Sequence, residues 1–133
     1  MKVLAENLDA ASQARVSAAH SDVRPRVLPG EWSEVESYEN ATRYESRDGL
    51  RVILETEMVD GALWLHASMS RRDRIPSWRD LQRVKDTFIG ADRKAIQVLP
   101  ARSEYVNRHP YCLHLFSPLD TDPLPDFRCG GDL

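Results

Sequence analysis

Residues 41–69 read ATRYESRDGLRVILETEMVDGALWLHASM. Two Asp-Gly pairs, Asp48-Gly49 and Asp60-Gly61, lie 12 residues apart in this stretch. Asp-Gly favours the positive backbone dihedrals of a tight hairpin turn, and the flanking aliphatic and aromatic residues favour strands. The stretch therefore predicts three antiparallel strands, over about residues 41–46, 50–58 and 62–69.

The segment that follows the third strand predicts a helix. Ser77 is placed to cap it, and Asp80 three residues later approximates a capping box. Gly90 is placed to end it, so we expect the helix over about residues 77–88. The side chains expected to pack against the sheet form one stripe: Trp78, Leu81, Val84, Lys85 and Phe88.

Two further strands are predicted over about residues 94–99 and 111–116. The resulting order is β-β-β-α-β-β. This order indicates an α+β fold, with an antiparallel sheet of about five strands and one helix packed on a face. We expect this single domain to span residues 31–118.

Both ends of the chain are expected to lie outside this domain. Residues 1–30 are predicted to be an N-terminal arm, either helical over about residues 3–19 or mobile. Prolines interrupt the arm near residue 30 and recur after residue 117, so residues 119–133 are predicted to be a flexible C-terminal tail.

The composition limits the class of protein. The chain has 133 residues, of which 41% are hydrophobic, which is enough for one domain with an apolar core. Its apolar runs are too short to cross a bilayer or to form a signal peptide. Cys112 and Cys129 are too few for a disulfide scaffold, so we expect a cytoplasmic protein without membrane contact.

Charge is distributed unevenly along a chain whose formal net charge is −3. Residues 71–108 carry ten basic and five acidic side chains, whereas the segments on either side are acidic. Arginine forks near a helix start suit phosphate or carboxylate, so segment 71–93 is a candidate nucleic-acid or nucleotide site. The alternative is local pairing with acidic side chains. The candidate binding residues are Arg71, Arg72 and Arg74, with Trp64 beside Trp78 as a stacking surface.

A polar loop between the last two predicted strands is a second candidate recognition site. Loops of this kind often carry binding residues. The alternative is a plain connection whose Tyr105 and Val106 pack into the core. The candidate residues of the loop are Tyr105, Asn107, Arg108 and His109.

Two strand histidines are weak candidates for catalysis. Alternation places His66 and His114 on the face away from the helix if their strands are neighbours. Two imidazoles can then serve as general base and general acid on a phosphate. The run His66-Ala67-Ser68 resembles one element of the two-histidine phosphoesterases, but Phe116 stands where the second element needs a hydroxyl. The alternative is that each histidine is hydrogen-bonded within the sheet face.

Metal binding and cofactors are not expected. His66, His109, His114 and Cys112 are ligand types that suit zinc, but they lack the spacing of a zinc motif. No glycine-rich phosphate loop or other catalytic motif is present in the sequence.

A longer pattern extends across residues 50–118. It comprises LHASMSRRD (65–73), PSW (76–78), VKDTFIG (84–90), AIQVLP (95–100), YVN (105–107) and HPYCLHL (109–115). It resembles a family of small uncharacterised phage and prophage proteins, a domain of unknown function. The family has a tryptophan where this chain has Phe116. The resemblance implies a viral or prophage origin and the cytoplasm of a bacterial host cell.

The leading interpretation is a non-enzymatic accessory protein that binds another macromolecule. The expected partner is a protein, for example a host factor. Pairing of exposed edge strands would also allow a homodimer. The alternatives are nucleic-acid or nucleotide binding through residues 71–93 and a two-histidine phosphodiesterase that uses His66 and His114.

Overall fold

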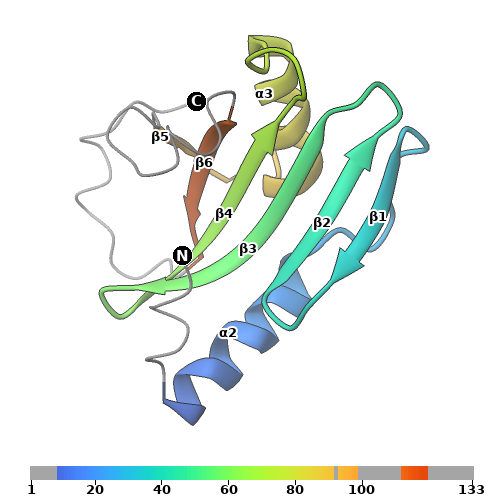
Figure 1. The fold of residues 1–133 in the computed structure, drawn as a ribbon. Helices are drawn as coiled ribbons and strands as arrows, with labels where there is room; N and C mark the ends of the chain where they lie inside the picture. The colour runs from blue at the N-terminus through green and yellow to red at the C-terminus, as the bar shows by residue number, and fades with distance from the viewer. Residues whose placement is uncertain (1–8, 92, 99–111, 120–133) are drawn as a thin grey trace.

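A computed structural model describes residues 9–91, 93–98 and 112–119 of the chain (Figure 1). Within these residues six strands form one antiparallel sheet in the order β1-β2-β3-β4-β6-β5. The fold is therefore α+β, as predicted. The strands are β1 (Trp32–Ser37), β2 (Ala41–Ser46), β3 (Arg51–Val59), β4 (Ala62–Ser70), β5 (Ile96–Val98) and β6 (Cys112–Pro118).

Strand β1 is the one strand of this sheet that the sequence did not predict. It lies at the edge and pairs with β2, with an irregular register between Glu34 and Glu36. Most of its side chains are exposed, because the strand WSEVES buries only Trp32. A strand without an alternating apolar face carries no pattern that sequence analysis can detect.

The two Asp-Gly pairs form turns of different length. Asp60 and Gly61 both have positive φ, of 51° and 81°, and they alone connect β3 to β4. This is the predicted two-residue hairpin turn. Only Gly49 has positive φ in the first pair, and four residues, 47–50, connect β2 to β3.

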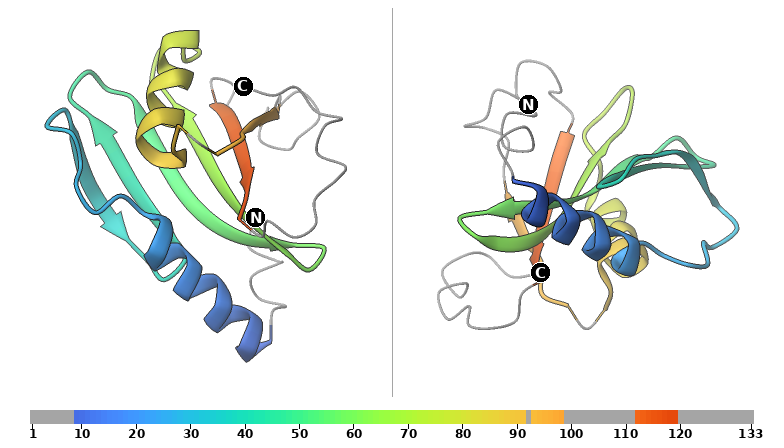
Figure 2. Two further views of the ribbon diagram at one scale, coloured as in Figure 1. Left: turned by 180° about the vertical axis from the view of Figure 1, so that it is seen from behind. Right: turned by 90° about the horizontal axis from the view of Figure 1, so that it is seen from below.

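Helices cover one face of the sheet, and the other face carries no helix among the described residues (Figure 2). The helices are α2 (Ala10–Val23), α3 (Trp78–Val84) and the π-helical turn η1 (Lys85–Ile89). Leu81, Val84 and Phe88 pack into the core with the inward side chains of the strands. We call the opposite side of the sheet the helix-free face.

An aromatic cluster forms the centre of the core. The ring centroid of Phe88 lies 4.9 Å from that of Trp32 and 4.6 Å from that of Tyr44. Since aromatic side chains bury large apolar areas, this cluster joins η1 to the first two strands. The buried aliphatic residues of β3, β4 and β6 extend the core from there.

Helix α3 begins as predicted but does not bury the predicted stripe completely. Ser77 caps the helix and forms the capping box with Asp80. Trp78, however, is 61% exposed. The carboxylate of Asp80 points inward, and a side chain two residues earlier on a helix points to the opposite side. The prediction that Trp78 packs against the sheet is therefore wrong.

Helix α2 packs against the sheet through a buried histidine. Asp9 caps this helix by accepting a hydrogen bond from the backbone N–H of Ser12 at 2.7 Å. Nδ1 of His20 lies 3.1 Å from the hydroxyl oxygen of Thr56, and Nε2 lies 2.8 Å from the hydroxyl oxygen of Thr42. Burial lowers the pKa of His20 to about 4, so the ring is neutral at pH 7.

Several predicted features lie outside the described residues. These are the start of the N-terminal arm (1–8), the loop with Tyr105, Asn107, Arg108 and His109, and the tail from residue 120. No helix in the described part of the chain is both long and apolar enough to cross a membrane.

Candidate functional site

Three neighbouring strands, β3, β4 and β6, place four polar side chains together on the helix-free face. In the register of β3 with β4, Glu55 is opposite His66 and Glu57 is two residues further along β3. In the register of β4 with β6, His114 is opposite Ser68. Because side chains alternate along a strand, these residues point away from the helices. We call Glu55, Glu57, His66 and His114 the histidine cluster.

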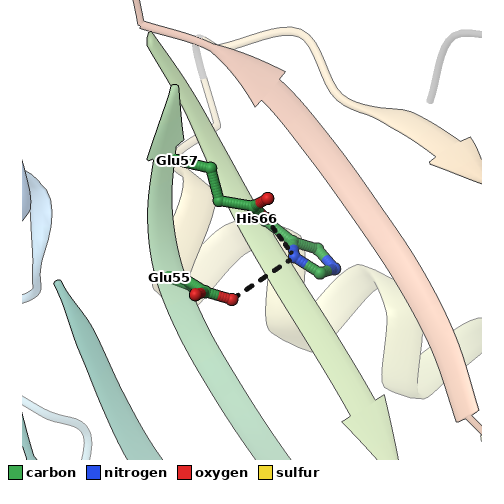
Figure 3. A group of neighbouring side chains, drawn as sticks. All are labelled: Glu55, Glu57 and His66. Carbon is green, nitrogen blue, oxygen red and sulfur yellow. Dashed lines mark hydrogen bonds and ion pairs between the residues drawn. The ribbon is translucent and has the colours of Figure 1, made fainter. Parts of the chain in front are cut away.

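Hydrogen bonds connect Glu57, His66 and His114 into a chain, and Glu55 lies within ion-pair distance of His66. Nδ1 of His66 lies 2.6 Å from a carboxylate oxygen of Glu57 and 3.9 Å from one of Glu55. Figure 3 shows both carboxylates directed at this nitrogen. The other ring nitrogen, Nε2, lies 2.8 Å from Nδ1 of His114. His66 therefore bridges two carboxylates and a second imidazole.

Aromatic rings pack around the two imidazoles. The ring of Phe116 stacks on that of His66 with a centroid distance of 4.2 Å and an interplanar angle of 5°. Trp64 meets Phe116 edge-on at 6.2 Å. Both histidines are buried, with 7% and 4% of their surface exposed. Water is therefore largely excluded from the bond between them, which strengthens its electrostatic component.

Sequence analysis found part of the histidine cluster and missed the rest. It placed His66 and His114 on one face, and the structure shows them in direct contact. Ser68 lies opposite His114, and no hydrogen bond joins it to either histidine in the described part of the chain. Glu55 and Glu57 were missed, although the two-residue turn at Asp60-Gly61 sets their register with β4.

A second group of polar residues surrounds Arg71, the residue that follows β4. The guanidinium donates two hydrogen bonds to the carboxylate of Asp80, at 2.8 and 2.7 Å, and a third to that of Asp48 at 3.1 Å. Arg83 bridges the same two aspartates and Glu31. The Arg71 guanidinium holds the pKa of Asp80 at about 2. The hydroxyl of Ser46 and the guanidinium of Arg83 keep the pKa of Asp48 well below its usual range.

This network corrects the expectation that Arg71 is an exposed anion-binding residue. Its side chain is buried, and its guanidinium donors are used by Asp80 and Asp48. The alternative of local pairing with Asp80 is what the structure shows. Trp64 also lies apart from Trp78, because six residue steps along extended β4, roughly 20 Å, lead from Trp64 to Ser70 at the end of the strand that precedes Trp78. They do not form one stacking surface.

The segment just beyond the network is exposed. Arg72, Arg74 and Arg79 are exposed and form no ion pair with any residue that the structure describes. Ile75 and Trp78 are exposed by 56% and 61%. A surface hollow of about 320 Å³ lies where this segment meets Gly49 and Arg51. We call residues 72–79 the exposed turn.

Fold and site together define a small α+β protein whose sheet has helices on one face and a buried histidine pair on the other. Residues 56–120 are similar to a domain of unknown function (DUF7694). The similar segment includes Glu57, His66, His114 and the whole exposed turn. No curated protein and no solved structure matches the chain.

Proposed function

We propose that this protein binds another protein, without catalysis, through the exposed turn. The observation that carries the proposal is an exposed Trp78 among arginines that have no acidic partner in the described structure. Tryptophan and arginine are the residues that most often dominate the energy of protein interfaces. Covering roughly 150 Å² of a tryptophan gives about 4 kcal/mol at 25 cal/mol per Å².

The internal network supports this proposal because it holds both ends of the turn. Arg71 precedes the turn and Asp80 follows it, and their two hydrogen bonds connect the ends directly. The turn is therefore ordered before any partner binds. A preorganised surface loses less conformational entropy on association than a mobile loop does.

The chemistry of the turn indicates the partner. Three arginines favour an acidic surface, and Ile75 and Trp78 favour an apolar pocket within it. Ile75 is an exposed aliphatic side chain that cannot stack on a base, whereas an apolar pocket on a protein surface can cover it. An acidic protein is therefore favoured over a nucleic acid.

The accessory role of a phage or prophage protein in a bacterial cytoplasm belongs to the same proposal. Its support is the resemblance of residues 50–118 to small phage and prophage proteins. The two-histidine phosphodiesterase receives less support, because a phosphate must fit between the two imidazoles. Here Nε2 of His66 and Nδ1 of His114 are only 2.8 Å apart and bond to each other.

A comparison of three baits tests the proposal. Wild type, Trp78→Ala and Val27→Ala are immobilised and exposed to nuclease-treated bacterial lysate. Val27 is an even more exposed apolar residue that lies outside the turn, so it is a matched control. We expect a protein that wild type and Val27→Ala retain and that Trp78→Ala loses at least about tenfold. Calorimetry with the purified partner should reproduce this difference.

Two outcomes would overturn the proposal. One is equal retention of every captured protein by the three baits. The other is a salt-sensitive shift of labelled DNA or RNA that is lost in an Arg72→Ala/Arg74→Ala variant. The second result would assign the turn to nucleic acid instead.

A further inference from the structure

We propose that Glu55, Glu57 and His66 form a binding site for a divalent first-row metal ion on the helix-free face. His114 is the residue that orients His66 for this role. The inference is independent of the exposed turn, which begins two residues after Ser70, the last residue of β4.

The three ligand atoms are close to the spacing that a metal ion requires. Metal–ligand distances of about 2.1 Å place neighbouring ligand atoms roughly 3.0–3.4 Å apart in octahedral or tetrahedral geometry. Nδ1 of His66 lies 2.6 Å from the oxygen of Glu57 and 3.9 Å from that of Glu55. All three ligand atoms lie within 4.8 Å of one another. Small rotations of the two glutamate side chains would equalise these distances.

Two carboxylates converge on one nitrogen of His66. Nδ1 lies 2.6 Å from a carboxylate oxygen of Glu57. Glu55 points its carboxylate at the same nitrogen (Figure 3). Carboxylates brought this close repel each other, and a dication bound between them would neutralise both.

The ligand types select the class of metal. Two carboxylates with one imidazole suit Mn²⁺, Fe²⁺ or Zn²⁺ better than Ca²⁺, which prefers oxygen ligands throughout. Three protein ligands also leave coordination positions for water or another small ligand. The side chains of Glu55 and Glu57 are 16% and 24% exposed, so an ion can reach them from solvent.

His114 supplies the partner that metal-binding histidines usually have. A ligating imidazole commonly donates its second N–H to an acceptor, which sets its tautomer and ring orientation. If Nε2–H of His66 donates to Nδ1 of His114, the lone pair of Nδ1 faces the two carboxylates. A metal ion binds this lone pair only when Nδ1 carries no proton, so metal binding is coupled to the release of any proton there.

Titration with Mn²⁺ tests the site. The full-length chain, without an affinity tag and stripped with a chelator, is titrated with Mn²⁺ while the electron paramagnetic resonance signal of the free ion is recorded. Manganese is chosen because cysteine thiolates bind it weakly, so Cys112 and Cys129 do not contribute. We expect one Mn²⁺ per chain, displaced by Zn²⁺, which forms the stronger complexes.

Conservative variants separate this site from non-specific binding. Glu55→Gln should weaken Mn²⁺ binding at least about tenfold, and it leaves the hydrogen bond between Glu57 and His66 in place. Glu45→Gln is the matched control, because Glu45 lies on neighbouring β2 and pairs with Arg51. It should bind Mn²⁺ as wild type does. Circular dichroism confirms that each variant is folded.

Either of two results would overturn the inference. The first is a folded wild-type protein that binds no Mn²⁺ and no Zn²⁺. The second is equal Mn²⁺ affinity in wild type, Glu55→Gln and a folded His66→Gln variant.

Discussion

Replacing Asp80 with asparagine tests whether its buried ion pair with Arg71 stabilises the protein. The pair lowers the pKa of Asp80 from 3.8 to about 2. Since one pKa unit corresponds to about 1.4 kcal/mol, ionised Asp80 contributes about 2 kcal/mol to the free energy of unfolding. Removing the charge also leaves the buried guanidinium of Arg71 without its closest counter-ion. We therefore expect Asp80→Asn to lose about 2–4 kcal/mol at pH 7.

The loss should depend on pH in a defined direction. The folded-state pKa of Asp80 lies below its unfolded value, so its contribution is complete above about pH 5 and falls as the pH decreases towards 2. At pH 3 the unfolded chain binds the proton and most folded molecules do not. About half of the contribution should remain there.

Urea unfolding at pH 7 and at pH 3, followed by circular dichroism, measures both effects. Asp73→Asn is the control, because Asp73 is exposed and forms no ion pair with the residues that the structure describes. It should stay within about 0.5 kcal/mol of wild type. A loss below 0.5 kcal/mol in Asp80→Asn at pH 7, or an equal loss at both pH values, would refute the argument.

Three further predictions concern stability. Burial lowers the pKa of His20 to about 4, so thermal unfolding should show a loss of stability between pH 6.5 and 4. The loss in the free energy of unfolding amounts to about 3 kcal/mol. If His20→Gln shows the same dependence of stability on pH, another group is responsible for the loss. Gly61→Ala should cost about 1 kcal/mol in a urea titration, because φ is +81° and an added Cβ meets nothing within 4 Å. A Cβ added at Gly30 also meets nothing within 4 Å, so Gly30→Ala should be neutral. Equal losses of stability in Gly30→Ala and Gly61→Ala would contradict the role of the positive φ at Gly61. Phe88→Ala should lose about 3–5 kcal/mol, whereas Trp78→Ala should stay near wild type, because Phe88 is buried and Trp78 is exposed. Similar losses in the two variants would contradict the exposure of Trp78.

The central hairpins were predictable because their signals are local. Asp60-Gly61 sets a two-residue turn, and that turn alone places Val59 opposite Ala62. Counting back along both strands places Glu55 opposite His66. Three of the four members of the histidine cluster could therefore be derived from residues 55–66 alone. The capping box at Ser77 and Asp80 was predictable for the same reason.

The fourth member of the cluster, His114, depended on packing between distant segments. His114 reaches His66 only because β6 pairs with β4, and 41 residues separate the end of β4 from the start of β6. Alternation in each strand states which residues share a face. It does not state which strands are neighbours.

Burial of polar side chains was also decided by the tertiary structure. The sequence shows Arg71, Arg72 and Arg74 as similar members of one basic loop. Of these three arginines, only Arg71 lies within reach of both Asp80 and Asp48, so it is buried while the other two remain exposed. The apolar periodicity of α3 likewise predicted a buried Trp78. In the first turn of this helix, however, the side chain that points towards the sheet is that of Asp80.

The sequence by itself determined the hairpins, the helix start and the faces of the strands, because backbone preferences and side-chain alternation act over a few residues. The tertiary structure decided the pairing of β6 with β4, the burial or exposure of each arginine and the exposure of Trp78. Those features depend on which distant groups compete for the same buried space, and that competition is settled only when the whole sheet is assembled.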